Sequence, residues 1–130
     1  MSLNDSLASA LAKINNAEKV GKTSVVLRPI SKMILKVLEI MKQFGYIGEY
    51  SVTEQSNGSF ITLTLIGKIN TCNVIKPRFP VQKDIYEKFE KRYLLAKGFG
   101  FLIVSTSKGV MTQDEAIEKN LGGRLIAYCY

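Results

Sequence analysis

Histidine is missing from this sequence, and its absence removes the commonest proton carrier for catalysis at neutral pH. Catalytic arrangements that pair histidine with serine or cysteine are therefore excluded. Tryptophan is also absent, and cysteine occurs only at Cys72 and Cys129. Two isolated cysteines make neither a zinc motif nor a disulfide framework. We expect two reduced thiols, no metal and no cofactor, with a single disulfide as the less favoured alternative.

Long apolar runs are missing as well. No stretch of the chain approaches the roughly 20 apolar residues of a membrane-spanning helix. Residues 1–16 include Asp5 and lack a continuous apolar stretch, so they do not have the pattern of a secretory signal. We therefore expect a soluble, cytoplasmic protein that does not span a membrane.

Acidic residues are the minority among the charged ones. Lysine and arginine total 18, aspartate and glutamate total 11, and the formal charge is +7 at pH 7. This excess predicts a polyanionic partner, either RNA, DNA or an anionic membrane, although a basic surface also serves solubility alone. Lys76 and Arg78 lie in a proline-rich segment, predicted as an edge strand or exposed arm, and are candidates for phosphate contact.

Apolar periodicity predicts a mixed α/β (α+β) protein, with two helices and three strands in its first half. The first helix has apolar residues at spacings of three and four and should end near Gly21. Ser31 is expected to cap the second helix, which should end at Gly45. Asn57-Gly58 predicts a hairpin between two strands, and in the second strand Ile61, Leu63 and Leu65 should point one way and Thr62 and Thr64 the other. The five elements are expected near residues 3–20, 23–28, 32–44, 46–53 and 59–66.

The second half is predicted to hold short strands and two helices. A connector over residues 67–73 divides the chain into two small packed α/β domains, residues 1–67 and 68–130. A charged surface helix is expected over residues 83–94, with Ile85 and Phe89 facing inward.

Two further strands and a helix are expected towards the end of the chain. A buried strand should cover residues 99–104, and a final strand residues 124–130. Thr112 and Glu115 have the spacing of a capping box that begins a short helix. In the final strand, Leu125, Ala127 and Cys129 should alternate against residues 126, 128 and 130.

The segment Ser105-Thr106-Ser107-Lys108-Gly109 is expected to lead from a buried strand into a helix N-terminus. Its hydroxyls and ammonium, beside the free N–H groups of a helix, suit an anion. Such a loop fits the wide, shallow minor groove of RNA, where ribose hydroxyls are displayed. Two alternatives stay open: an ordinary turn held by local hydroxyl bonds, and a Ser105–Lys108 catalytic dyad, which needs a buried lysine.

Two tyrosines of the final strand are further candidates for contact with RNA. Tyr128 and Tyr130 have rings that stack on bases or ribose in many complexes. They pack equally well across a pair of strands, and we favour packing for at least one of them.

The C-terminal motif closely resembles a known family. The segment VSTSKGVMT at residues 104–112, followed by Glu115-Ala116 and Gly122-Gly123, is similar to the signature of the universal small-subunit ribosomal protein eight family. The resemblance covers nearly the whole chain and includes residues 11–17, 28–32, 44–49 and 76–79. Residues 15–19 and 46–50 resemble the archaeal and eukaryotic cytosolic branch, called S-fifteen-A in eukaryotes.

The resemblance implies a structural, non-enzymatic protein of two small α/β domains. It implies binding to the central domain of small-subunit rRNA, support of subunit assembly and translation, neighbouring ribosomal proteins as partners, and no small-molecule substrate. The C-terminal domain would contact RNA mainly through residues 105–109. The contacts implied for the N-terminal domain are Lys13, Asn15, Asn16, Ser31 and Lys32.

Three positions bear on the lineage and on the RNA contact. Arg124 stands where bacterial members usually carry glutamate, and a guanidinium cannot accept a hydrogen bond from a base. We therefore expect Arg124 to meet phosphate. Lys108 and Thr112 match bacterial and archaeal members, whereas eukaryotic members commonly have alanine and aspartate there, so the lineage stays open.

Overall fold

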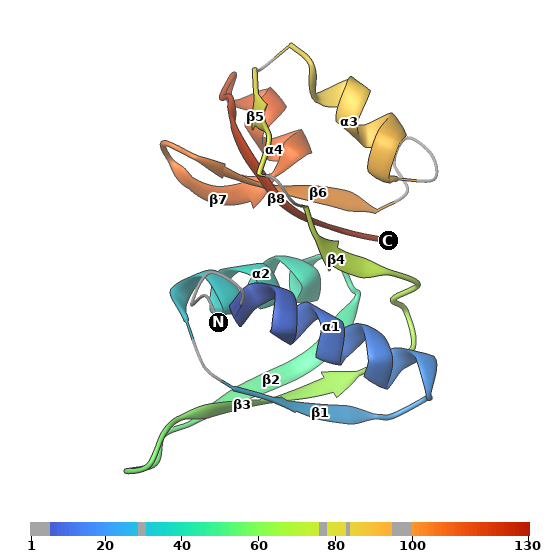
Figure 1. The fold of residues 1–130 in the computed structure, drawn as a ribbon, viewed down its shortest axis with the longest axis vertical. Coiled ribbons are helices and arrows are strands. Elements are labelled where there is room, and N and C mark those ends of the chain that lie inside the picture. Colours follow the sequence, from blue (N-terminus) through green and yellow to red (C-terminus); the bar gives the residue numbers. More distant parts are fainter. Residues whose placement is uncertain (1–5, 29–30, 76–77, 83, 95–99) are drawn as a thin grey trace. The chain divides into compact units, whose positions relative to one another are not determined.

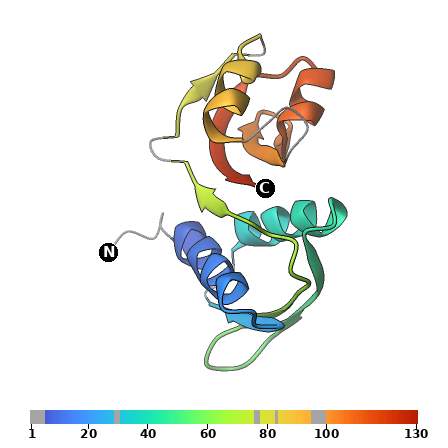
Figure 2. The ribbon, with the colours of Figure 1, turned by 90° about the vertical axis from the view of Figure 1, so that its right-hand side faces the viewer.

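The chain folds into two compact units, Met1–Asn70 and Thr71–Tyr130. The computed structural model describes residues 6–28, 31–75, 78–82, 84–94 and 100–130. Each unit combines helices with an antiparallel sheet, so the fold is α+β, as the sequence predicted. Figures 1 and 2 show these elements in two views. Among the described residues, no helix is long and apolar enough to cross a membrane.

The first unit packs two helices against one face of a three-stranded sheet (Figure 1). Its elements are α1 (Ser6–Lys19), β1 (Ser24–Leu27), α2 (Lys32–Gln43), β2 (Ile47–Thr53) and β3 (Phe60–Leu65). β3 lies in the centre and pairs antiparallel with both neighbours. Ile61, Leu63 and Leu65 are buried while Thr64 is exposed, which confirms the predicted alternation of this strand.

Both helices of the first unit end at a glycine, as predicted. Gly21 and Gly45 have positive φ angles of 77° and 80°, which glycine adopts without steric cost. After α2, the N–H of Gly45 donates to the carbonyl of Lys42, and that of Tyr46 donates to the carbonyl of Met41. These bonds satisfy carbonyls that the last helical turn leaves unpaired, so the local sequence is sufficient to stop the helix.

The second unit packs two short helices on one face of a larger antiparallel sheet. Its elements are β4 (Cys72–Val74), β5 (Pro80–Val81), α3 (Tyr86–Tyr93), β6 (Phe101–Thr106), β7 (Gly109–Thr112), α4 (Gln113–Glu118) and β8 (Gly123–Cys129). The strand order is β4-β8-β6-β7, and β5 also pairs with β8. The core between helices and sheet is formed by Ile75, Val81, Tyr86, Phe89, Leu94, Leu102, Val104, Met111, Ala116 and Leu125.

Tyr86, and not Ile85, is the inward residue at the start of α3. Ile85 precedes the helix and is 38% exposed, so its predicted inward position is wrong, whereas Tyr86 is 1% exposed. The Tyr86 hydroxyl donates to the carbonyl of Leu121 at 2.9 Å, and burial raises the pKa of this phenol. Phe89 is buried, as predicted. A tyrosine is buried here because its hydroxyl finds an acceptor that the sequence pattern does not reveal.

β4 begins inside the segment that was expected to be a connector. Cys72 is the first residue of β4, within predicted connector residues 67–73, and pairs with β8. A three-residue strand carries too little pattern to be recognised by itself, because its main-chain partners lie far away in the sequence.

A β-bulge interrupts the alternation predicted for the last strand. Ile103 pairs with Ala127 but Val104 pairs with Leu125, which leaves Ile126 as an extra residue in β8. Leu125 therefore lies on the same face as Tyr128 and Tyr130, against the core cluster, although the predicted alternation placed it on the opposite face from them. The prediction was wrong because a bulge reverses the side-chain alternation beyond it.

Candidate nucleic-acid interface

The hydroxyl-rich segment predicted to grip RNA forms the tip of a β-hairpin. Ser105 and Thr106 are the last residues of β6, and Thr106 lies opposite Gly109, the first residue of β7. Only Ser107 and Lys108 are left for the turn, which Gly109 closes with a φ of 118°. Ser107, Lys108 and Gly109 are all exposed. The tip therefore presents one hydroxyl and one ammonium to solvent.

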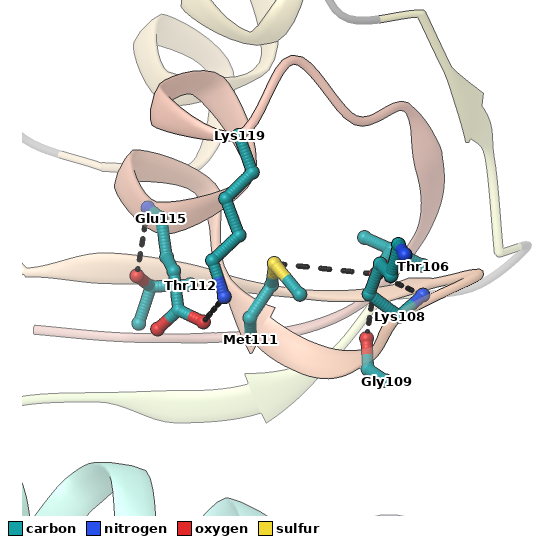
Figure 3. A network of polar contacts seen from close by, with 7 residues as sticks. All are labelled: Thr106, Lys108, Gly109, Met111, Thr112, Glu115 and Lys119. Carbon is teal, nitrogen blue, oxygen red and sulfur yellow. Dashed lines mark hydrogen bonds and ion pairs between the residues drawn. The ribbon is translucent and has the colours of Figure 1, made fainter.

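The expectation that this segment leads directly into a helix is wrong. β7 intervenes, and α4 begins only at Gln113. Thr112 caps α4 by accepting the N–H of Glu115 at 3.3 Å, which confirms the predicted capping residue. Figure 3 shows Thr112 and the turn residues at opposite ends of β7. Because the helix dipole acts mainly within its first turn, α4 does not help the hairpin tip to hold an anion.

Thr106 holds the turn together from inside (Figure 3). Its hydroxyl donates to the carbonyl of Gly109 at 2.8 Å and accepts the N–H of Lys108 at 3.1 Å. A contact of 4.0 Å to the sulfur of Met111 competes for the same hydroxyl proton, and the carbonyl is the shorter and stronger acceptor. Thr106 thus supports the turn, while Ser107 beside it is exposed.

Arg124 lies next to Ser105 on the face of the sheet that points away from the core. The two residues pair directly across β6 and β8, and Val110 of β7 lies on the other side of Ser105. Side chains of directly opposed residues share a face. The neighbouring row, Val104 with Leu125, belongs to the core, so the Ser105–Arg124 row faces outward. The tertiary pairing brings together a hydroxyl and a cation that are far apart in the sequence.

Gly123 allows β8 to approach β6 closely beside this row. A Cβ atom at Gly123 would collide with the main-chain oxygen of Ser105 and would lie 2.9 Å from Cγ1 of Val104. By sequence, Gly122-Gly123 indicates no more than a turn before the final strand. Gly123 is therefore a positioning residue that the sequence-based prediction missed. The feature that could have indicated it is its place immediately before Arg124, a cationic residue of the final strand.

Arg78 reaches the same region through the main chain. The Arg124 guanidinium donates from Nη1 to the carbonyl of Arg78 at 3.3 Å, and Pro80 lies opposite Arg124 in β5. The proline-rich segment is thus partly an edge strand, one of the two forms predicted for it. Lys76 lies outside the described residues. Arg78 and Arg124 are both exposed.

In the part of the chain that the structure describes, no acidic side chain forms an ion pair with the basic residues around the hairpin tip. Among the described residues, the ion pairs join Lys42 with Glu49, Lys91 with Glu87 and Lys119 with Glu115. None of these pairs involves the three basic residues near the tip, which are Arg78, Lys108 and Arg124. Exposed cations without an acidic partner suit phosphate groups, which would displace only water and counterions.

Tyr128 lies on the other face of the sheet from the Ser105–Arg124 row. It is half-buried, with its ring centroid 5.3 Å from that of Tyr93 and 6.1 Å from that of Tyr130. Its hydroxyl lies 3.5 Å from the side-chain nitrogen of Asn73. Tyr128 and Tyr130 both pack against the core, which agrees with the preference for packing. The structure does not bring Tyr128 together with the hairpin tip.

In the first unit, Lys13 and Asn16 line a shallow groove of about 310 Å³ between α1 and β1. The Lys13 ammonium donates to the carbonyl of Val26 at 3.0 Å. Lys22 lines the same groove and was missed by the sequence analysis, because it follows the helix and becomes its neighbour only through the turn at Gly21. Asn15 is only 9% exposed, so it lies on the inner side of α1 and apart from this groove.

Ser31 and Lys32 form the start of α2. The Ser31 hydroxyl accepts the N–H of Ile34 at 3.1 Å, which confirms the predicted cap and already engages this hydroxyl. Ser31 is half-buried, whereas Lys32 is exposed. Of this pair, the lysine is therefore the more accessible to a partner.

Neither catalysis by Ser105 nor metal binding finds support in the side-chain arrangement. A serine–lysine dyad needs a buried lysine, and Lys108 is exposed in the turn. Among the described residues, no cluster of three or more Cys, Asp or Glu side chains is arranged to hold a metal ion.

The family model described as ribosomal protein S8 matches residues 5–130, nearly the whole chain.

Proposed function

The chain belongs to the ribosomal protein S8 family, so it is a small-subunit ribosomal protein that binds rRNA, and we propose that the hairpin tip (residues 105–109) makes its main contact with the RNA. The family implies rRNA and other ribosomal proteins as partners. We further propose that the bound region is the central domain of the rRNA, and that binding supports subunit assembly and translation. The ribosome is proposed to be cytosolic and of the archaeal and eukaryotic type.

The observation that supports the hairpin tip most is the row of Ser105 and Arg124 beside the exposed turn Ser107-Lys108. A hydroxyl both donates and accepts, so it matches a ribose 2′-hydroxyl or a base edge. Cations on either side match the phosphates. A two-residue turn is narrow, and it projects these groups towards the shallow minor groove of an RNA helix.

The first unit adds a second set of contacts under this proposal. Lys13, Asn16 and Lys22 line one groove, and Lys32 is exposed at the start of α2. These side chains would meet the sugar–phosphate backbone and contribute affinity with little sequence preference.

The test is filter binding to a small-subunit rRNA fragment at physiological salt. Combining Ser105→Ala with Ser107→Ala is expected to weaken binding about tenfold or more, because each lost hydrogen bond costs on the order of 1 kcal/mol. The matched control combines Ser51→Ala with Ser56→Ala, two exposed hydroxyls of the first unit, and should keep full affinity. Full affinity of the hairpin variant would rule out the tip as the contact.

Competition separates rRNA recognition from general nucleic-acid binding. The labelled rRNA fragment is challenged with unrelated duplex RNA and with duplex DNA of equal length. Shape and 2′-hydroxyl contacts predict that DNA competes poorly. Equal competition by all three would favour a binding protein that recognises charge alone.

A further inference from the structure

We propose that Cys72 and Cys129 form a dithiol site, which a small organic disulfide oxidises to a disulfide bond between β4 and β8. The two residues lie directly opposite each other in the sheet. They form no disulfide in the structure, and the two residues are 0% and 1% exposed. The inference does not depend on RNA binding.

The hydrogen-bond pattern of the two strands fixes the geometry of the pair. In an antiparallel ladder, opposed residues alternate between pairs that exchange two main-chain hydrogen bonds and pairs that exchange none. Thr71 and Tyr130 exchange two bonds, each of 3.0 Å. Cys72 and Cys129 come next, so they are a pair that exchanges none. Such pairs have Cα atoms about 4.5 Å apart, within the range of roughly 4.4–6.8 Å that disulfides adopt.

The same alternation continues along β4. The N–H of Ile75 donates to the carbonyl of Ile126 at 2.8 Å, an even number of residues beyond the Thr71–Tyr130 pair. The register is therefore fixed on both sides of the cysteines. Opposed side chains in this register share one face, so the two sulfur atoms are directed to the same side of the sheet.

The reaction is a thiol–disulfide exchange with oxidised glutathione. One cysteine loses its proton, and its thiolate attacks a sulfur of glutathione disulfide, which releases one glutathione thiolate. The other cysteine then loses its proton and attacks the protein sulfur of this mixed disulfide. A second glutathione thiolate leaves. The protein loses two protons and two electrons, and the oxidant becomes two molecules of reduced glutathione.

Access to the buried thiols requires a local opening of β4. This strand has only three residues and is at the end of the strand order, so it has a paired neighbour on one side. Short edge strands open without global unfolding. The new bond would prevent this opening. Arg124 lies near the other end of β8 from Cys129, so the bond should leave the hairpin tip unchanged.

The experiment uses the reduced wild-type chain and oxidised glutathione under native conditions. After denaturation and alkylation, mass spectrometry should find a chain that has lost two hydrogen atoms and carries no alkyl group. The melting temperature should rise by about 10 °C, because the bond closes a long loop in the unfolded chain. Affinity for the rRNA fragment should stay unchanged.

A matched control moves one thiol by a single residue. Combining Cys72→Ser with Asn73→Cys keeps two thiols but turns one to the opposite face of β4, so no intramolecular disulfide should form. The conclusion rests on the wild-type chain, and therefore holds even where this control is unstable. The proposal is overturned when the native chain still accepts two alkyl groups under conditions that fully oxidise the heat-unfolded chain. A lower melting temperature after oxidation overturns it as well.

Discussion

The dipeptide Ser-Lys occurs twice in the chain, once in each unit, and its two copies have different surroundings. In Ser31-Lys32, the serine hydroxyl is half-buried and accepts the N–H of Ile34 at 3.1 Å. In Ser107-Lys108, both residues are exposed, and the turn is held by the hydroxyl of Thr106 instead. The same two residues thus serve mainly the fold in one place, while in the other they are presented to a partner.

This comparison shows that residue type alone does not decide which hydroxyl is available to RNA. The Ser31 hydroxyl is engaged because a helix begins there with unpaired N–H groups. The Ser107 hydroxyl is not needed to hold its turn, because the hydroxyl of Thr106 makes the hydrogen bonds there. Four sets of variants separate stability from RNA affinity and so test the difference.

The largest effect is expected from Gly123→Ala, which disturbs the packing of β8 against β6, the strand that leads into Ser107-Lys108. The added Cβ collides with the main chain of Ser105 and forces β8 away from β6. We expect a loss of about 2–4 kcal/mol in the free energy of unfolding, because neither strand can move without breaking the sheet. Urea denaturation followed by circular dichroism measures the loss. An unchanged unfolding midpoint would show that the strands adjust freely.

The next effect is expected from Thr106→Val, which keeps the shape of the side chain but removes its hydroxyl. The carbonyl of Gly109 and the N–H of Lys108 both lose this partner. The cost should be roughly 1–2 kcal/mol of unfolding free energy, with a parallel loss of RNA affinity. Thr64→Val, at an exposed position of β3, is the control and should change neither quantity. Equal behaviour of the two variants would contradict the role given to Thr106.

The direct comparison is Ser31→Ala against Ser107→Ala. Loss of the helix cap should cost about 1 kcal/mol of unfolding free energy, and Ser31→Asn should restore most of it. Ser107→Ala should leave stability within about 0.5 kcal/mol of the wild type, because its hydroxyl is exposed. Filter binding should show the reverse order, with a loss of about fivefold for Ser107→Ala, the equivalent of roughly 1 kcal/mol. A Ser107 variant that loses stability but not affinity would invalidate the distinction.

The smallest effect concerns the two lysines. Lys108→Gln should reduce the slope of log binding constant against log salt concentration by about 1, as expected for the loss of one phosphate contact. Lys32→Gln should reduce this slope by the same amount, because Lys32 is proposed to contact the sugar–phosphate backbone of the RNA. Lys91→Gln is the control, because this ammonium lies 3.6 Å from Glu87 on α3 and should leave the slope unchanged. Equal slopes for all three variants and the wild type would exclude phosphate contact at either lysine.

The elements predicted correctly are those with a strong local signal. The Ser31 cap, the helix end at Gly45 and the alternation of Ile61, Leu63 and Leu65 all follow from nearby residues. The motif of residues 104–112 was enough to indicate the family, which the family comparison confirms. Such signals act over a few residues, so the rest of the fold does not alter them.

The elements predicted incorrectly depend on distant partners. The burial of Tyr86 depends on an acceptor at Leu121, and the bulge at Ile126 depends on the pairing with β6. β7 was overlooked because a strand of four residues, which begins in a turn and ends at a helix cap, has too little pattern to be recognised. Each of these features is decided by a contact across the sheet or between a helix and a loop.

The sequence by itself determined the charge, the absence of histidine, the family and the N-terminal caps of α2 and α4, because these are properties of single residues or of close neighbours. Only the tertiary structure decided that Ser105 lies beside Arg124, that Thr106 supports the turn, and that the two cysteines face each other. Strand register makes these decisions, since a shift of one residue would turn each side chain to the opposite face. The register is a property of the whole sheet and cannot be obtained from any one strand.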